Sequence, residues 1–484
     1  MKVHDTLQDA LVEFIPRREG EVSLYACGPT VYSHPHLGHA RQAMTYDIMR
    51  RYLEWTGLRV HHVANVTDID DKIINRALEE GRTETEVATE WKAVYDAAME
   101  ALNILEPHDR PHATEYVDEM VDMISTLVDN GSAYANESGV YLRVRSVEDY
   151  GALIHRTPDE LAEGAQARVE VDDNKEDPLD FALWKAAKPG EPTWESPWGP
   201  GRPGWHIEFA AMSLDILGDG FDIHGGGTDL AFPHHTNERA EALAAGREFA
   251  RYWLHNAMIN INGEKMSKSL NNFQTIEALL AENPLNARAL RLLLLQTHYR
   301  KSFDIDDDSM HQAREGVKRL DAMARKAATA GIDAANTELD AAILDRFCDA
   351  MDQDFGTPDA MATVFETVRR ANGALDGGDD ADQAPALALT AVELANVLGL
   401  QVSIGGTSSG AGSGSGAGTG FGTGSGAGHG AGSGIDEEAI NALLEARTEA
   451  KANKDFAEAD RIRDELTAMG ITVEDTPSGP IWYR

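Results

Sequence analysis

The sequence predicts an α/β protein with a parallel sheet, followed by an all-α domain and a small C-terminal module on a tether. Residues 21–66 have the pattern of a strand, a glycine-containing turn, a helix and a second strand, which is the order of a βαβ unit and therefore of a parallel sheet. Residues 275–400 show almost continuous helical periodicity. Residues 405–434 contain fifteen glycines and no charged side chain, so burial cannot offset their ordering entropy.

The first elements of the sheet can be placed in order. An alternating segment, 21–26, is the first strand and ends at the turn 27–30. The segment 38–55 carries its large apolar side chains at spacings of four, four and three residues, which predicts a helix, and Gly57 is its expected C-cap. The apolar segment 58–66 follows as the second strand.

The rest of the chain divides into an insertion, a helical part and a terminal module. Residues 139–202 are irregular and rich in proline and glycine, and strand patterns resume at 221–224 and 252–261. The glycine-rich tether has an expected span of roughly 30 Å. After it come two amphipathic helices, of which Gly470 ends the second, and a tail that can add a strand. The expected segments are 1–115 and 203–274 for the sheet domain, 116–202 for the insertion, 275–404 for the helical domain, 405–434 for the linker and 435–484 for the module.

Length and charge limit the possible classes of protein. The 484 residues are too many for one hydrophobic core, so two to four domains are expected. Lysine and arginine number 43 against 81 acidic residues, a net charge of −38, which argues against anionic membranes and, at face value, against nucleic acid. One interpretation is a charged surface that maintains solubility. We favour salt adaptation, because only 13 of the basic residues are lysines. In molar salt the Debye length is about 3 Å, so net charge no longer excludes RNA binding.

The two cysteines, Cys27 and Cys348, exclude a disulfide framework. Free thiols suit a reducing cytoplasm, which is the expected location, and Cys348 is expected to be a buried structural residue. The N-terminal residues have no apolar segment typical of a signal peptide. No apolar run reaches the roughly 18 residues of a membrane span, so no membrane partner is expected. We expect a monomer.

Two motifs have the chemistry of phosphate binding. His36-Leu37-Gly38-His39 opens the first long helix, where free N–H groups and the helix dipole favour anions. Its alternative interpretation is a helix start that happens to contain histidines. Lys265-Met-Ser-Lys268-Ser269 follows the last predicted strand and contains two of the thirteen lysines. Its alternative is a solvated polar loop, but its lysines and serines suit a triphosphate whose charge grows during displacement of pyrophosphate.

These two motifs on opposite sides of a split α/β domain resemble those of class I aminoacyl-tRNA synthetases. The neighbouring segments narrow the resemblance to the cysteinyl-tRNA synthetases, and it covers nearly the whole chain. The segments that carry it are Tyr25-Ala-Cys-Gly-Pro-Thr-Val-Tyr32, Asn65-Val-Thr-Asp-Ile-Asp-Asp-Lys72, Pro203-Gly-Trp-His-Ile-Glu208, His224-Gly-Gly-Gly-Thr-Asp229, Phe232-Pro-His-His235 and Asp455-Phe-Ala-Glu-Ala-Asp-Arg-Ile-Arg463.

The resemblance implies a Rossmann-type catalytic domain carrying an insertion, a helical stem-contact and anticodon-binding domain, and a C-terminal module that completes the anticodon contact. It implies catalysis by ATP-phosphate-binding residues, namely His36, His39, Lys265 and Lys268. It implies that ATP, with Mg²⁺, is also held by Gly38, His224, Gly225, Gly227 and Asp229, at the carboxyl end of a strand. The residues implied around the amino acid are Gly28, Thr67 and Trp205.

The resemblance also implies one zinc ion, held in the family by two cysteines, a histidine and a glutamate. Cys27, His234 and Glu238 match, but Phe209 occupies the position of the second cysteine. In one interpretation three protein ligands remain and the substrate thiolate is the fourth; in the other, Phe209 fills the space and zinc is lost. We favour retention, because zinc strongly prefers thiolate, whereas packing rejects an isosteric hydroxyl by only about a hundredfold.

The function implied is ATP-dependent activation of L-cysteine and its transfer to the 3′ end of tRNA(Cys). One alternative is a cysteine-activating ligase with an amino-sugar acceptor, although such enzymes lack an anticodon domain. Another is a catalytically silent paralogue, for which Phe209 is the best support. Basic and aromatic side chains that are candidates for RNA contact are Arg288, Arg291, Arg300, Lys301, Lys451, Lys454, Arg461, Arg463, Trp482 and Tyr483.

Overall fold

The computed structural model divides into two units, residues Met1–Gly405 and Gly406–Arg484. The structure describes residues 1–164, 174–261, 264–265, 274–332 and 337–404 of the first unit, and 443–444, 446–448, 450–451, 456–468, 472–476 and 479–483 of the second. The predicted linker 405–434 and residues 266–273 of the lysine-containing loop therefore lie outside the described residues.

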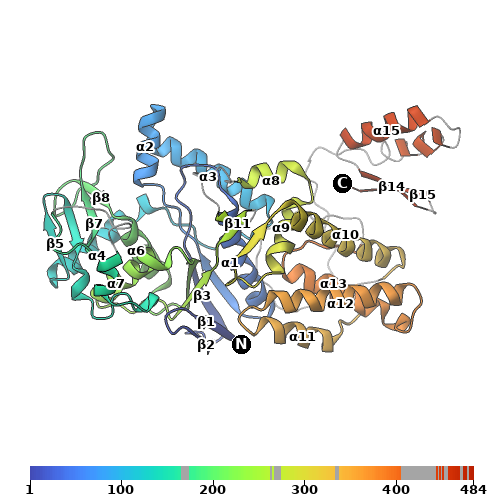
Figure 1. Cartoon of the computed structure of the whole chain (residues 1–484), viewed down its shortest axis with the longest axis horizontal. Helices are drawn as coiled ribbons and strands as arrows, with labels where there is room; N and C mark the ends of the chain where they lie inside the picture. The colour runs from blue at the N-terminus through green and yellow to red at the C-terminus, as the bar shows by residue number, and fades with distance from the viewer. Residues whose placement is uncertain are drawn as a thin grey trace, which may run out of the picture. The chain divides into compact units, whose positions relative to one another are not determined.

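A four-stranded parallel sheet forms the centre of the first unit (Figure 1). Its strands, in spatial order, are β10 (Tyr252–Asn256), β9 (Ile223–Gly227), β3 (Glu21–Ala26) and β4 (Arg59–Val63), and every neighbouring pair is parallel. Helix α1 (Leu37–Trp55) connects β3 to β4, so the predicted βαβ unit is confirmed. Because the chain returns to β9 beside β3 only after about 160 intervening residues, the carboxyl ends of three strands from distant segments meet at one edge.

The segment between β4 and β9 forms a second, antiparallel sheet with its own core. Its strands are β5 (Ala133–Asn136), β6 (Gly139–Leu142), β7 (Phe181–Ala186) and β8 (Gly201–Pro203), paired in that order. The helices of this region are α2 (Asp71–Glu80), α3 (Glu84–Ala101), α4 (Val117–Asp129), α5 (Pro158–Gly164) and α6 (Trp205–Leu217), and α7 (Thr236–Ala244) follows β9. The core includes Ile124, Leu142, Trp184 and Met212, so α6 joins the insertion to the parallel sheet.

The C-terminal half of this unit is helical, as predicted. Its helices are α8 (Ile276–Glu282), α9 (Asn286–Leu295), α10 (Asp307–Thr329), α11 (Ala341–Met351), α12 (Thr357–Leu375) and α13 (Ala384–Val397). A short mixed sheet is formed by β11 (Ile259–Ile261), β12 (Glu264–Lys265) and β13 (Phe303–Ile305). Strand β11 falls within the predicted strand pattern 252–261, whereas β12 and β13 were not predicted. One continuous apolar core runs from the parallel sheet into these helices, and the ring of Tyr52 on α1 contacts Phe347 and Phe355.

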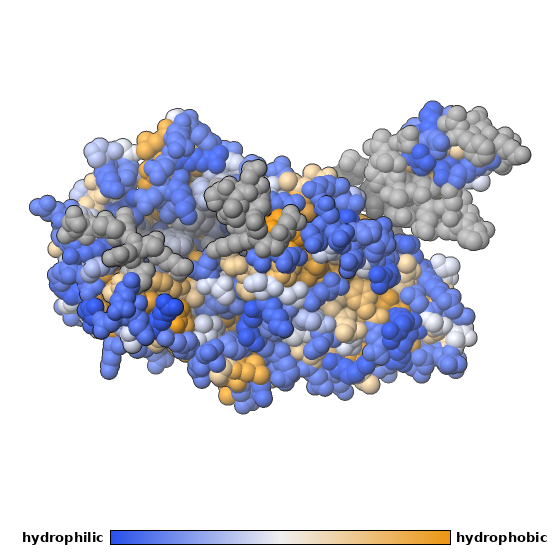
Figure 2. Space-filling model, in the orientation of Figure 1, coloured by the Kyte–Doolittle hydropathy of each residue, from blue (hydrophilic) through white to orange (hydrophobic). Residues whose placement is uncertain are grey.

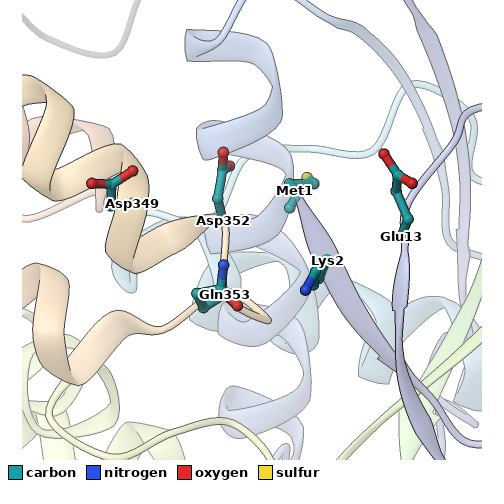
Figure 3. Close-up of a pocket in the computed structure, with 6 residues that line it drawn as sticks. All are labelled: Met1, Lys2, Glu13, Asp349, Asp352 and Gln353. Carbon is teal, nitrogen blue, oxygen red and sulfur yellow. The ribbon is translucent and has the colours of Figure 1, made fainter.

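An N-terminal hairpin connects the sheet to the helices. Strands β1 (Lys2–Asp5) and β2 (Ala10–Glu13) pair antiparallel. The backbone N–H of Lys2 donates to the carbonyl of Asp352 at 2.7 Å, and the N–H of Asp354 donates to the carbonyl of Lys2 at 2.9 Å. Met1, Lys2 and Glu13 line a shallow acidic hollow with Asp349, Asp352 and Gln353 of the helical half (Figure 3).

The visible surface is largely hydrophilic (Figure 2), as the net charge of −38 leads one to expect. No helix in the described part of the chain has the length and apolar character needed to cross a membrane. In the second unit, α15 (Phe456–Ala468) precedes a hairpin of β14 (Thr472–Thr476) and β15 (Gly479–Tyr483). Ile462 and Leu466 of α15 are buried, which agrees with the predicted amphipathic helix, and the predicted tail strand is present.

Candidate active site

The predicted histidine pair shapes the first turn of α1. His36 is the N-cap: its Nδ1 accepts a hydrogen bond from the N–H of Gly38 at 3.1 Å, and its own N–H donates to Nδ1 of His39 at 3.1 Å. The two rings stack at a centroid distance of 3.8 Å. Burial, with a smaller contribution from His36, lowers the pKa of His39 to about 3, so this ring is neutral at pH 7. Since Nδ1 accepts in both rings, the neutral forms carry their proton on Nε2, which is a donor suited to an anion.

The lysine-containing loop is attached to the same helix end. Its first described residues, Glu264–Lys265, form β12. Where the chain is described again, the carbonyl of Gln274 accepts a hydrogen bond from the N–H of Leu37 at 3.3 Å, and Thr275 pairs with His36. The backbone therefore brings the end of the loop to the start of α1. The side chains of Lys265 and Lys268 lie outside the described part of the structure.

The residues predicted around the amino acid are linked by side-chain hydrogen bonds. The N–H of Gly28 donates to Oδ1 of Asn65 at 2.8 Å, Nδ2 of Asn65 donates to the hydroxyl of Thr67 at 3.3 Å, and that hydroxyl donates to Oε2 of Glu208 at 3.1 Å. A Cβ on Gly28 would lie 1.6 Å from the carbonyl oxygen of Asn65, so only glycine fits there. Trp205, one helical turn before Phe209 on α6, is partly buried.

Four buried side chains from four segments converge beside this chain of hydrogen bonds. They are Cys27 after β3, His224 on β9, His235 in the π-helical turn Ala231–His235, and Glu238 on α7, and their ligand atoms lie within 4.8 Å of one another. Sγ of Cys27 lies 3.1 Å from Nε2 of His235 and 3.5 Å from Nε2 of His224. Nε2 of His224 lies 3.1 Å from Oε2 of Glu238.

The chemistry of this cluster fits a metal ion. Burial raises the pKa of the Glu238 carboxyl and of the Cys27 thiol, with Glu238 adding to the latter, and burial lowers the pKa of His224 to about 3. Despite its contact with His224, Oε2 of Glu238 has no hydrogen-bond partner among the described residues. A buried carboxylate without such partners is costly, whereas a divalent ion balances one thiolate and one carboxylate. One sulfur, two imidazole nitrogens and one oxygen form a donor set typical of zinc.

His234 contacts the other carboxylate oxygen of Glu238, Oε1. Its Nε2 is 3.1 Å from Oε1 of Glu238, and its Nδ1 is 2.8 Å from Nδ1 of His206. Trp205 stacks on the His234 ring at 3.9 Å, and the buried ring of Phe209 meets it edge-on at 4.3 Å. The three predicted ligands meet at one carboxylate oxygen, because Oε1 of Glu238, which His234 contacts, also lies 4.0 Å from Sγ of Cys27. His224 and His235 lie nearer to the thiol, and His234 is not one of the four residues whose ligand atoms all lie within 4.8 Å.

The predicted adenosine-binding residues do not share one environment. His224 is fully buried in the ligand cluster, and Asp229 is exposed. A Cβ on Gly225 would lie 2.2 Å from the ring of Tyr46, and one on Gly227 would lie 2.4 Å from Oδ1 of Asp229. The glycines of β9 therefore allow α1 and the following loop to approach the strand closely.

Family models match three segments of the chain. The tRNA synthetases class I (C) catalytic domain matches residues 13–315, the DALR domain 346–403, and the cysteinyl-tRNA ligase anticodon binding domain 437–483. A cysteine–tRNA ligase of Alkalilimnicola ehrlichii is 46% identical over 493 residues and covers 100% of both chains. One of Halorhodospira halophila is 44% identical and covers 100% of this chain and 99% of its own. The chain belongs to the cysteinyl-tRNA ligase family.

The fold of this cysteinyl-tRNA ligase family member is shared with other class I synthetases. The Mycobacterium tuberculosis methionyl-tRNA synthetase in complex with methionyl-adenylate matches with a TM-score of 0.58 at 16% identity, covering 78% of this chain and 90% of that one. The predicted fold class, a Rossmann-type sheet with an insertion followed by helical domains, is thereby confirmed.

Three arginines that were candidates for RNA contact make ion pairs within this family member. Arg291 is 1% exposed and its Nη1 donates to Oδ2 of Asp47 at 2.6 Å. Arg288 donates to both oxygens of Asp321, and Nε of Arg300 donates to Oδ2 of Asp354 at 2.6 Å. Helical periodicity does not reveal such partners, because they come from distant segments.

Other expectations for this family member have mixed outcomes. Arg461 pairs with Glu458 and Glu465, and Arg463 with Asp460, on exposed faces of α15. Cys348 is half-buried, less than predicted, and burial raises its pKa. The sequence reasoning assigned no role to Asn65, Glu208 and His235, although all three stand in the motifs that carried the resemblance.

Proposed function

We propose that the chain is an ATP-dependent cysteine–tRNA ligase. In the first step an oxygen of the cysteine carboxylate attacks the α-phosphorus of ATP. A new O–P bond forms, the bond to the bridging oxygen breaks, and pyrophosphate leaves. In the second step a hydroxyl of the 3′-terminal ribose of tRNA(Cys) attacks the carbonyl carbon, and AMP leaves as the hydroxyl proton is lost. Neither step needs a covalent enzyme intermediate, so catalysis depends on positioning and electrostatic stabilisation.

The phosphate-binding group is the histidine pair with the lysine loop. The Nε2 donors of His36 and His39 and the first-turn N–H groups near Gly38 would face phosphate oxygens. Lys265 and Lys268 would stabilise the charge that develops on the departing pyrophosphate, with Mg²⁺ bound to ATP. Support comes from the backbone pairing between Thr275 and His36, which holds the end of the loop at the helix start.

The remaining site residues divide between nucleoside and amino acid. Gly225, Gly227 and Asp229 are proposed for the adenosine, at the carboxyl end of β9. Gly28, Thr67 and Trp205 are proposed to surround the cysteine, with Asn65 and Glu208 fixing the first two. A zinc ion held by Cys27, His234 and Glu238, with His224 and His235 beside the thiol, would favour a substrate thiolate over an alcohol.

The tRNA is proposed to contact the helical segment 275–404 and the C-terminal module 435–484, which the linker 405–434 joins. The catalytic site is proposed to lie in segments 1–115 and 203–274, which flank the insertion 116–202. We propose that the enzyme acts as a monomer in the cytoplasm, where tRNA is found. Support comes from the matches to a DALR domain and to an anticodon binding domain in these two segments.

The observation that carries the proposal is the attachment of the lysine loop at the helix start, next to strands that end in a buried thiol. The test is exchange of labelled pyrophosphate into ATP in molar KCl, with cysteine or serine as substrate. Exchange that depends on cysteine and exceeds that with serine is expected. Absence of cysteine-dependent exchange would contradict the proposal and favour a silent paralogue.

Charging of a tRNA transcript with a GCA anticodon separates the proposed ligase from one with an amino-sugar acceptor. Acylated transcript is expected. Exchange without charging would support the amino-sugar alternative. A His39→Asn variant is the matched test of the site, because asparagine can still accept the His36 N–H bond while it removes the imidazole donor; exchange is expected to fall about 10²–10³-fold.

A further inference from the structure

We propose that Lys72 is a further phosphate-binding residue of the candidate active site, and that the ring of Tyr32 holds its ammonium group in position. The sequence motifs gave neither residue a role, although both stand in segments that carry the resemblance. The inference rests on the proposed function for the source of the phosphate group, which is either ATP or the 3′-terminal phosphodiester of the tRNA. Activation and charging assays distinguish these two sources.

The segment that ends at Lys72 lies beside the loop that leads into α1. The N–H of Val31 donates to the carbonyl of Thr67 at 3.3 Å, and the N–H of Thr67 donates to the carbonyl of Pro29 at 3.1 Å. Val31 also belongs to a small apolar core with side chains of α2 and α3 (Figure 1). Because Lys72 is the second residue of α2, this packing fixes its backbone near the helix start that carries the histidine pair.

The ammonium of Lys72 lies over the ring of Tyr32. Nζ of Lys72 is 5.4 Å from the ring centroid, a distance at which a cation and an aromatic ring attract each other. The carbonyl of Tyr32 accepts a hydrogen bond from Nη1 of Arg76 at 2.6 Å, and the guanidinium of Arg76 lies 4.3 Å from the ring centroid of the buried Trp91. Tyr32 is thus held in a packed surface, so the ammonium has a restricted position although Lys72 is exposed.

The neighbouring carboxylates are engaged elsewhere. Asp68 accepts hydrogen bonds from the N–H and the hydroxyl of Thr114, at 3.0 and 2.7 Å, and Asp71 pairs with basic side chains of β7 and β8. Asp70, the N-cap of α2, accepts from the backbone N–H of Lys72 at 2.9 Å. Among the described residues Lys72 forms no ion pair, although the chain has 81 acidic residues. This exposed cation is therefore available to an anionic ligand.

The ammonium of Lys72 also acts electrostatically on the histidine pair. Burial lowers the pKa of His39 to about 3, and His36 and Lys72 add to this shift in that order. His39 is therefore neutral at pH 7, and its ring offers a hydrogen-bond donor without a net charge. A lysine ammonium is a compact point charge that binds phosphate oxygens. Lys72 supplies from α2 the positive charge that the neutral His39 ring lacks.

The first test replaces the charge at position 72. Lys72→Gln should raise KM at least about tenfold for one ligand, either ATP in pyrophosphate exchange or a transcript with a GCA anticodon in charging. A higher KM for ATP identifies the phosphate as that of ATP, and a higher KM for the transcript alone identifies the phosphodiester of the tRNA. Unchanged KM values for both ligands would overturn the inference.

Two further variants separate charge from structure. Lys72→Arg keeps the positive charge and should bring the KM values to within about threefold of those of the unmodified chain. Equal losses in Lys72→Arg and Lys72→Gln would overturn the inference, because the charge would then not matter. Lys188→Gln, which removes the charge of an exposed lysine in the insertion, is the matched control and should leave both KM values unchanged. A loss there as large as in Lys72→Gln would indicate an effect of net charge and would also overturn the inference.

The supporting role of Tyr32 has its own pair of variants. Tyr32→Phe retains the ring and should leave unchanged the KM that Lys72→Gln raises, whereas Tyr32→Leu should raise it about two- to fivefold. Equal KM values in the two variants would contradict the positioning role. Circular dichroism identifies a variant that fails to fold, in which case the variants of the exposed Lys72 decide.

Direct binding keeps this inference separable from the proposed function. Isothermal titration with ATP, and with the transcript in dilute and in molar KCl, measures both affinities without turnover. If the phosphate belongs to the tRNA, the slope of log affinity against log salt concentration should become shallower by about 0.7–0.9 in Lys72→Gln. Cysteine-dependent exchange by the unmodified chain, with both affinities unchanged in Lys72→Gln, ends this inference alone. A chain without exchange, in which Lys72→Gln still lowers one affinity, ends only the function.

Discussion

The carboxylate of Glu208 ends a series of hydrogen bonds that positions the residues around the proposed cysteine pocket. Its Oε2 accepts the Thr67 hydroxyl hydrogen at 3.1 Å, and the series continues through Asn65 to the N–H of Gly28. Burial, with Asp70 contributing, raises the pKa of the Glu208 carboxyl. A buried acceptor that fixes the orientation of the Thr67 hydroxyl also orients the Asn65 amide that is hydrogen-bonded to it. Glu208 is therefore a positioning residue for the proposed cysteine pocket.

We predict that Glu208→Gln raises KM for cysteine about tenfold and changes kcat by less than about threefold. The amide keeps the volume but weakens the hydrogen bond by about 1–2 kcal/mol. Steady-state pyrophosphate exchange measures both parameters. Glu100→Gln, at an exposed position on α3, is the matched control and should leave both unchanged; a kcat loss with constant KM would contradict the positioning role.

His62 on β4 gives a prediction about pH. It is 6% exposed, neither ring nitrogen has a hydrogen-bond partner within the described part of the chain, and burial together with Arg50 lowers its pKa to about 3. The unfolded side chain titrates near 6.5. Between pH 6.5 and 3 the unfolded chain therefore binds one more proton at this site, and the free energy of unfolding falls as pH is lowered.

We expect His62→Gln to reduce this loss by up to about 1.4 kcal/mol per pH unit. Denaturant unfolding at pH 7 and pH 5 measures it for the variant, the unmodified chain and His311→Gln, an exposed histidine on α10. The pH dependence of His311→Gln should equal that of the unmodified chain. An equal dependence in all three proteins would show that His62 is not a source of the acid sensitivity.

At the scale of elements, α1 connects the site to the helical half. Its first turn carries the histidine pair, Tyr46 packs under β9 beside Gly225, and Asp47 accepts a hydrogen bond from the buried Arg291 of α9. Arg291 also donates to the carbonyls of Leu102 and Asn103 at the end of α3. The guanidinium therefore holds three helices together rather than facing RNA.

We predict that Arg291→Met lowers the free energy of unfolding by about 3–5 kcal/mol, because it leaves the Asp47 carboxylate buried without its main partner. Denaturant titration in molar KCl measures the change. The matched control is Arg319→Met, at an exposed position on α10, where a change within about 0.5 kcal/mol is expected. A stable Arg291→Met protein with weakened tRNA binding would instead restore the RNA-contact interpretation.

The sequence predicted those elements whose own residues show a clear helix or strand periodicity. The βαβ unit was found because β3, α1 and β4 each show their own periodicity. Three-residue strands such as β13 are too short to show one, so residues 303–305 were assigned to a helical region. The segment 102–116, between α3 and α4, pairs with the end of β4 through Asp109 and Val63, and no local pattern marks such a pairing.

The sequence motifs predicted part of the candidate site. The sequence identified Cys27 and Glu238, both members of the ligand cluster. It did not reveal that His224 and His235 lie close to the thiol, because only the tertiary structure shows in which direction adjacent residues such as His234 and His235 point. His235 contacts His255, which is 20 residues away in the sequence, and His255 contacts Thr6, which is 249 residues away. No local pattern connects these residues.

At the scale of the whole molecule, the net charge of −38 should make stability depend on salt. In dilute buffer the carboxylates repel one another, whereas in molar salt the Debye length falls to about 3 Å. We predict that the thermal midpoint rises by more than about 5 °C when KCl increases from 0.1 to 2 M. Scanning calorimetry at constant pH measures it, and a constant or falling midpoint would contradict salt adaptation.

The N-terminal hairpin has a consequence for how the polypeptide emerges from the ribosome. The N–H of His4 donates to a carboxylate oxygen of Asp354, 350 positions further along, and Lys2 bonds to Asp352 and Asp354. At translation rates of about 5–20 residues per second, the first strand waits on the order of 20–70 s before those groups have been synthesised. During that interval the nascent chain exposes Val3 and Phe14, which are buried in the folded protein, so its earliest segment presents apolar surface that a chaperone can bind.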